Sequence, residues 1–463
     1  MSTQSTPVTW LVREIAAAVA HGDITASDIA EMVLERIHAT EDRIQAFSQL
    51  DVALVKKQGE MLSAEASAGN LRGPLHGVPI AIKEWFDVEG FPTLLKGPDA
   101  PPEAKDSTIV GRLRAAGALI VGKTHVPIGA TAPPTRNPWN LAHSPGGSSS
   151  GSAAAVAARV VPLAIGEQTG GSILRPAAFC GVGAIKPTYG ALSRAGLYTG
   201  VWSRDHPGLI GLNMQDMALV LSVVGGYDPR DPRTIGWPAP SADLEVDTIR
   251  PPKIGVTRNF FPDLTDPMML DAVDRSALRF ADAGAEVVDA LLPDEFAVAW
   301  DAVQMQEVER ATAKAEHWAK GGPVTIDDLG PDPVAADGPS QRVGELIPGS
   351  YYLQSQRIRT WLSSLVVELL RKHQLDALLM AATPGPAPVG LHSTGSMRLL
   401  IPWSFLGFPA ISVCAGLSDD GLPLGLQLVA APREDQPLLR VGHWGEHVLG
   451  LLAPPDLARG TGA

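Results

Sequence analysis

The stretch PGGSSSGSAAAVAARVVPLAIGEQTGGSILRP, from Pro145 to Pro176, decides the fold of this chain. It joins a Gly/Ser-rich loop to a good helix former, Ser152 to Arg159, and then to a short apolar run, Val160 to Ile165. A continuous apolar run bounded by turn residues is typical of a strand that is buried on both faces. The stretch therefore predicts a helix followed by a buried strand, with a Gly/Ser turn at each end.

The same pattern recurs along the chain. A helix is predicted over Ser107 to Ala116, between apolar runs at Val78 to Ile82 and Ala118 to Val121. Further strand-like runs lie at Lys253–Val256, Ala285–Val288, Asp376–Met380, Ile411–Cys414 and Leu424–Val429. Alternating helices and buried strands indicate an α/β layered fold.

The chain is interpreted as one domain with four parts. These are covering helices over 1–70, a core over 71–230, a variable segment over 231–370, and a C-terminal part of the core over 371–463. In the first part, Thr25 and Asp28 are spaced as a helix cap, and a pair of helices is predicted. In the variable part, the Pro-, Gly- and Asp-rich stretch 321–348 predicts loop.

Composition excludes several classes of protein. The 463 residues carry a formal net charge of −13, which argues against a nucleic-acid partner and against an anionic membrane surface. Two cysteines, Cys180 and Cys414, provide neither a disulfide framework nor a zinc ligand set. A reducing cytoplasm fits this usage, and Met1 to Trp10 lacks the pattern of a signal peptide.

One uncharged stretch, Leu399 to Leu417, is nearly long enough to cross a membrane. Pro402, Gly407 and Pro409 interrupt it, so a buried strand-and-loop segment is predicted instead.

Two short motifs match by letter but not by context. Gly117 to Thr124 fits the P-loop pattern, yet its central Ala-Leu-Ile-Val favours a buried strand rather than a phosphate-binding turn. Gly147 to Gly151 fits the nucleophile elbow of α/β-hydrolases, but Asn140 to Pro145 before it is a poor strand. Neither motif carries a function here.

Three segments together indicate catalysis. Lys83 ends an apolar run, where burial lowers a lysine pKa and permits a neutral, basic amine. Ser148 lies in glycine-rich backbone that runs directly into a core helix. The Thr169-Gly170-Gly171 turn before a serine allows successive N–H groups to converge, as an oxyanion hole requires.

This combination resembles the amidase-signature family, whose core holds a Ser-cisSer-Lys triad. The resemblance covers most of the chain outside residues 230–370. It implies one large α/β domain with a mixed β-sheet covered by α-helices on both faces. It also implies that Ser172 is the nucleophile, Ser148 the proton relay and Lys83 the base, with no metal or organic cofactor. Thr169, Gly170 and Gly171 would form the oxyanion hole.

The family implies hydrolysis of a carboxamide C–N bond in a small molecule, and carbamates and esters share this chemistry. Arg175 resembles the arginine of the malonamidase-like branch, where it could pair with a substrate carboxylate. Four aromatic residues near the motifs are candidates for an apolar pocket: Trp85, Phe86, Trp139 and Trp403. A homodimer is expected only by analogy with the family.

The chain also departs from the family pattern. Gln168 and Leu174 replace a common Asp and Arg, and Ser150 replaces a common Gly, which puts the rim of the pocket in doubt. Two other functions stay open. One is the catalytic subunit of a tRNA-dependent amidotransferase, and the other is a non-catalytic binding protein on the same scaffold.

Overall fold

The computed structural model describes residues 10–97, 99–127, 133–244, 249–309, 344 and 346–457. In these residues, eleven strands form one sheet in the order β1-β3-β2-β4-β6-β5-β10-β11-β9-β7-β8. The strands are β1 (Phe47–Leu50), β2 (Pro79–Lys83), β3 (Leu119–Thr124), β4 (Leu163–Gln168), β5 (Gly183–Lys186), β6 (His206–Gly211), β7 (Lys253–Thr257), β8 (Glu286–Ala290), β9 (Ala377–Ala381), β10 (Ala410–Leu417) and β11 (Pro423–Val429).

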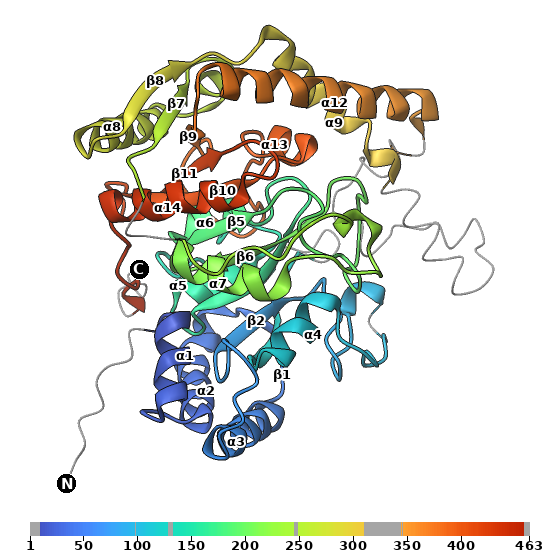
Figure 1. Ribbon diagram of the computed structural model, residues 1–463, viewed down its shortest axis with the longest axis vertical. Helices are drawn as coiled ribbons and strands as arrows, with labels where there is room; N and C mark the ends of the chain where they lie inside the picture. The colour runs from blue at the N-terminus through green and yellow to red at the C-terminus, as the bar shows by residue number, and fades with distance from the viewer. Residues whose placement is uncertain are drawn as a thin grey trace.

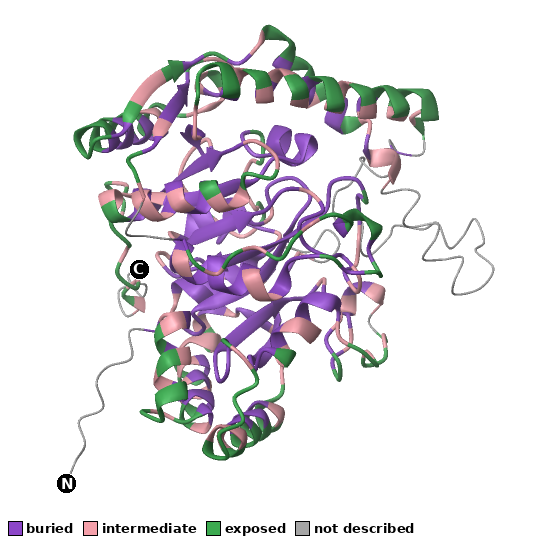
Figure 2. Ribbon diagram, viewed as in Figure 1, coloured by how far each residue is buried: buried purple, intermediate pink, exposed green. Residues whose placement is uncertain are grey.

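The sheet is mixed. Strand β2 runs parallel to both β3 and β4, and β7 runs parallel to both β8 and β9. The central strands β4, β6, β5, β10 and β11 pair antiparallel in succession. The central strands of the sheet are buried, whereas the edge strands β1 and β8 are partly exposed and much of the surface of α3 and α12 faces solvent (Figure 2).

Helices cover both faces of the sheet. They are α1 (Val12–His21), α2 (Ala26–Ile44), α3 (Val52–Ser67), α4 (Thr108–Ala115), α5 (Ser150–Ala157), α6 (Leu174–Cys180), α7 (Met214–Val224), α8 (Pro267–Asp282), α9 (Ala299–Gln304), α12 (Gly349–Lys372), α13 (Ile401–Leu406) and α14 (Asp435–Leu449). Helices α5 and α6 pack together on the central strands, while α7, α8 and α14 form a second contacting group on the same part of the sheet. Helices α1 to α3 lie at one end of the molecule and α12 at the other (Figure 1).

Most predicted elements are found within a few residues of their predicted bounds, and the α/β class with a mixed sheet is confirmed. The two predicted N-terminal helices are found as α1 and α2, but the third helix α3 and the edge strand β1 in the same region were missed. The capping box of Thr25 and Asp28 does begin α2. Most of the predicted loop over 321–348 lies outside the described residues.

The uncharged stretch Leu399 to Leu417 is buried over most of its length, but it is not only strand and loop. Its first half contains α13, which ends at Gly407 in the left-handed conformation, and its second half is β10. No helix among the described residues is long and apolar enough to span a membrane.

The two letter-matching motifs do not form the structures that their patterns describe. The P-loop match falls on β3, whose residue Lys123 is buried against Glu84 with 3.1 Å between Nζ and Oε1. Its central apolar residues therefore belong to the sheet and form no phosphate-binding turn. The segment around Ser149 enters α5 from a loop, whereas a nucleophile elbow requires a preceding strand.

The candidate site lies where two neighbouring parallel strands end. Lys83 is the last residue of β2, and Glu167 and Gln168 are the last two of β4. Because parallel strands present their carboxyl ends at the same edge, these side chains are brought together across a long stretch of sequence.

Candidate active site

Lys83 is the buried centre of the candidate site. Its side chain has no solvent exposure, and its Nζ atom donates to Ser148 Oγ at 2.8 Å. The same atom donates to the backbone carbonyl of Glu167 at 2.9 Å and to its carboxylate Oε2 at 2.8 Å. The sequence-predicted relay serine and base are therefore in direct hydrogen-bond contact.

Two opposing effects act on the Lys83 amine. Burial lowers the pKa of Lys83 below its ordinary value, since the charged form loses its hydration. The carboxylates of Glu167 and Asp205 raise it, but burial is the larger effect, so the net pKa is lowered. The pKa of this lysine is thus shifted toward the range in which its neutral form can act as a base.

Ser148 and Ser172 come from two loops that hydrogen-bond to each other. The peptide bond between Gly147 and Ser148 is cis, and the following residue, Ser149, donates its N–H to the Ser172 carbonyl at 3.1 Å. Both Ser148 and Ser172 are partly exposed, although their neighbours are buried. A substrate can therefore reach these two serines, while Lys83 stays beneath them.

The remaining serines of the Gly/Ser loop hold its shape. Ser150 donates its hydroxyl to the Gly146 carbonyl at 2.7 Å, so the serine that replaces a common glycine has a structural partner. A Cβ atom on Gly151 would lie 2.0 Å from the Ala46 carbonyl oxygen, so only glycine permits this approach of α5 to the edge of the sheet.

Gln168 fixes the loop that carries Ser172. Its side-chain oxygen accepts the N–H groups of Ile173 and Leu174 at 2.8 and 3.0 Å. Its Nε2 atom donates to Ser404 Oγ at 3.0 Å, and Ser404 in turn donates to the Gly170 carbonyl at 2.8 Å. Gln168 and Leu174 are both buried. These two departures from the family pattern therefore lie in the core rather than at the rim of a pocket.

The glycines of the predicted oxyanion turn face a separate segment. A Cβ atom on Gly170 would lie 2.5 Å from Met397 Sδ, and one on Gly171 would lie 2.9 Å from Leu400 Cδ1. The hydroxyl of Thr169, the first residue of this turn, has one hydrogen to donate and lies within hydrogen-bond distance of two carboxylates, Glu167 Oε1 at 3.0 Å and Asp205 Oδ1 at 2.6 Å. The turn is thus packed closely on one side and hydrogen-bonded into the site on the other.

The four predicted pocket aromatics are placed differently. Trp85 is half-buried, with its ring centre 4.8 Å from Lys83 Nζ. Trp139 is also half-buried and donates its indole N–H to the Cys180 carbonyl at 2.8 Å. Phe86 and Trp403 are buried in the core, and Trp403 stacks on Phe261 with ring centres 5.8 Å apart. Of the four, Trp85 is the one in contact with the predicted base.

Arg175 is held by backbone carbonyls. Its Nε and Nη2 atoms donate to the Gly147 carbonyl at 3.0 and 2.6 Å, and Nη1 donates to the Gly395 carbonyl. The guanidinium group therefore ties the residue before Ser148 to the segment over the oxyanion turn. Its pairing with a substrate carboxylate stays a prediction.

Sequence reasoning missed Glu167. Its carboxylate contacts both Lys83 and Thr169, and the residue is fully buried. The available signal was a charged residue at the end of an otherwise apolar run, a position at which an unpaired carboxylate would be costly.

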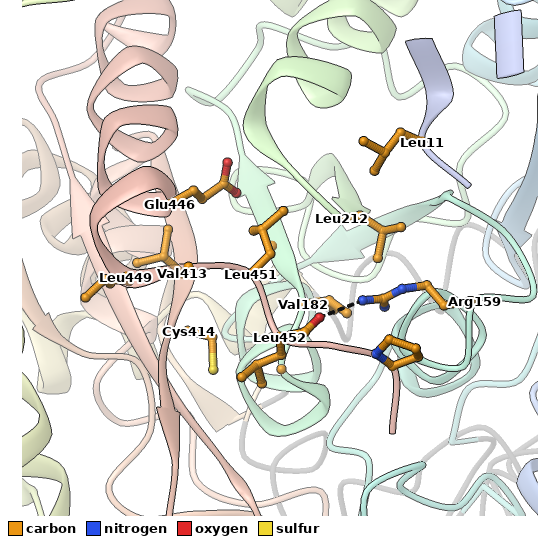
Figure 3. A pocket seen from close by; sticks show the side chains of 14 residues that line it. Leu11, Arg159, Val182, Leu212, Val413, Cys414, Glu446, Leu449, Leu451 and Leu452 are labelled. Atoms are coloured by element: carbon orange, nitrogen blue, oxygen red, sulfur yellow. Dashed lines mark hydrogen bonds between the residues drawn. The ribbon is translucent and has the colours of Figure 1, made fainter. Parts of the chain in front are cut away.

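A cavity of about 240 Å³ lies away from these residues (Figure 3). It opens between α14, β10 and the C-terminal tail, and its lining includes Arg159, Cys414 and Glu446 but no predicted site residue. Among the described residues, no group of three or more His, Cys, Asp or Glu side chains is arranged to hold a metal ion.

The mixed α/β sheet agrees with the fold that the resemblance to the amidase-signature family implied. The chain belongs to the Amidase family, whose family model matches residues 28–439, and it is an amidase-type enzyme. It is 34% identical to a glutamyl-tRNA(Gln) amidotransferase subunit of Salinispora tropica, over 96% of this chain and 98% of that protein.

Two further similarities extend this finding. The chain is 35% identical to the AtzE subunit of 1-carboxybiuret hydrolase from Pseudomonas sp., over 93% of this chain and 96% of that protein. The solved peptide amidase of Stenotrophomonas maltophilia superposes with a TM-score of 0.82 at 27% identity, covering 98% of this chain and 99% of that one. Proteins named for different reactions thus match this chain over nearly its full length.

Proposed function

We propose that the protein is an amidohydrolase that cleaves a carboxamide C–N bond of a small molecule through an acyl-enzyme on Ser172. The observation that carries this proposal is the contact of 2.8 Å between the buried Lys83 Nζ and Ser148 Oγ, next to the loop of Ser172. A desolvated amine hydrogen-bonded to a serine is the arrangement that a serine–lysine relay needs.

In the proposed mechanism, Ser172 Oγ attacks the substrate carbonyl carbon. Ser148 accepts the Ser172 proton while passing its own proton to neutral Lys83. The N–H groups of Thr169, Gly170 and Gly171 stabilise the oxyanion, a contribution of roughly 3 kcal/mol per donor. The proton then returns through Ser148 to the leaving amine, and water hydrolyses the acyl-enzyme. Carbamates and esters could enter the same sequence of steps.

We place the substrate between Trp85 on one side and the segment of Met397 on the other. Trp85 is half-buried beside Lys83, and Met397 packs over Gly170 and is 41% exposed. Trp139 and Arg175 border the same loops, so they stay candidates for substrate contact. Phe86 and Trp403 lie in the core, and we expect them to support the pocket rather than touch the substrate.

The nucleophile is tested by intact-mass spectrometry after exposure to a fluorophosphonate. We expect one adduct on the wild type and none on Ser172→Ala, with matching loss of hydrolysis across a panel of amides, carbamates and esters. Ser276→Ala is a matched control, because Ser276 is a buried serine on α8 whose hydroxyl donates to the Ala272 carbonyl of the same helix. Adduct formation on Ser172→Ala would place the nucleophile on another residue, whereas no adduct on a folded wild type would refute the acyl-enzyme and favour a binding protein.

A second function requires an equal test. The identity of 34% to a glutamyl-tRNA(Gln) amidotransferase subunit over nearly the whole chain favours an amidase that works within a tRNA-dependent complex. Release of ammonia from glutamine, together with a partner protein that co-purifies with the chain, would support that function. Hydrolysis of small amides by the isolated chain, without glutaminase activity, would support the first.

A further inference from the structure

The three hydrogen-bond partners of Lys83 define which way a neutral amine must point. An ammonium group has three hydrogens to donate, whereas a neutral amine has two hydrogens and one lone pair. The three partners are Ser148 Oγ, the Glu167 carbonyl and the Glu167 carboxylate, all within 2.9 Å. A base that takes a proton from Ser148 must turn its lone pair to that hydroxyl, so both hydrogens go to Glu167.

The Glu167 carboxylate is itself fixed. Oε2 accepts from Lys83 at 2.8 Å, and Oε1 lies 3.0 Å from the Thr169 hydroxyl, whose single hydrogen it shares with Asp205 Oδ1 at 2.6 Å. The side chain is 1% exposed and lies at the end of β4, next to the parallel strand β2 that carries Lys83. Such a group cannot rotate away without leaving a buried charge unpaired.

We propose that Glu167 is a positioning residue of the proton relay: its carbonyl and carboxylate bind the two hydrogens of the neutral Lys83 amine and hold the lone pair toward Ser148. This inference rests on the proposed serine–lysine function. It adds Glu167 to the relay as a fourth residue, which acts through Lys83 and contacts neither the substrate nor the nucleophile. The remaining charged groups that face Lys83 are Asp205, in the loop before β6, and Arg175 on α6.

Two substitutions separate the hydrogen bond of Glu167 from its charge. Glu167→Gln keeps an acceptor oxygen but removes the charge that raises the pKa of Lys83. In the pH profile of the fluorophosphonate labelling rate, the plateau of Glu167→Gln should then stay within about tenfold of the wild type. The acid limb, where the rate falls as Lys83 is protonated, should move to lower pH by about one unit or more. Glu167→Leu removes the side-chain acceptor, and the plateau of its labelling rate should fall about 100-fold below the wild type.

A second buried pair of the same kind supplies the control. Lys123 and Glu84 lie 3.1 Å apart with no exposure, and the contacts of this pair do not include Ser148. Glu84→Gln should therefore lower the free energy of unfolding without moving the acid limb. Each labelling rate is measured on the folded fraction, determined by circular dichroism.

The outcomes distinguish this inference from the proposed function. Two results would overturn the role of Glu167 but leave the proposed function standing, provided that the wild type labels. One is an acid limb that stays in place in Glu167→Gln, and the other is a labelling rate of Glu167→Leu within about threefold of the wild type. A wild type that never labels would overturn both the role of Glu167 and the proposed function. If Glu167→Leu does not fold, the shift of the acid limb in Glu167→Gln still tests the role of Glu167.

Discussion

Replacing Lys83 with methionine tests the buried ion pair and the base together. The Lys83 and Glu167 side chains are 0% and 1% exposed, and Nζ lies 2.8 Å from Oε2. Removing the lysine leaves a buried carboxylate without its cation, which typically costs about 3–5 kcal/mol. The double variant Lys83→Met/Glu167→Gln removes both charges and should recover most of that free energy of unfolding.

Urea denaturation at pH 7 measures the stabilities, and fluorophosphonate labelling measures the chemistry. Neither variant should label at more than about 1% of the wild-type rate, because both lack the base. Lys123→Met is the matched control: it breaks the similar pair with Glu84, so it should lose comparable stability yet still label when folded. A loss below about 1 kcal/mol in Lys83→Met, or labelling by the double variant, would refute the reasoning.

Two further predictions concern residues outside the relay. Burial raises the pKa of Glu446 from 4.5 to about 8, so the native state keeps a proton that the unfolded chain loses between these values. The stability that this group contributes is full below pH 4.5 and falls as the pH rises toward 8. Glu446→Gln should therefore reduce the dependence of the urea midpoint on pH across that window. An unchanged dependence would contradict the raised pKa of Glu446. Gly151→Ala should lower the midpoint of thermal unfolding sharply or prevent folding, because the new Cβ would meet the Ala46 carbonyl at 2.0 Å. A midpoint within about 2 °C of the wild type would show that the loop can move aside.

Local pattern was sufficient for most of the fold. The strands β2, β3 and β4 were predictable because short apolar runs between turn residues require burial on both faces. The edge strand β1 and the strands β5 and β6 were missed. β1 is only four residues long and partly exposed, while β6 contains a proline and two glycines. Their strand conformation depends on the neighbours they pair with.

Part of the candidate site was likewise predictable from local sequence, and part was not. The residue types around Lys83, Ser148 and Ser172 suggested a relay from the sequence, because glycine turns and a lysine at the end of a strand have local signatures. Nothing local distinguished Trp85, which stands over Lys83, from Trp403, which stacks in the core. Burial of an aromatic residue depends on what the rest of the chain places against it.

What the sequence alone determined is therefore the class of fold, the family and the residues that could carry the chemistry. The tertiary structure alone decided the partners of those residues. It placed Glu167 on the amine of Lys83, 84 positions away in the chain, and it turned Gln168 into the anchor of the nucleophile loop. Parallel pairing of β2 with β4 brings these groups to one edge, and the low polarity there makes an unpartnered charge or N–H costly.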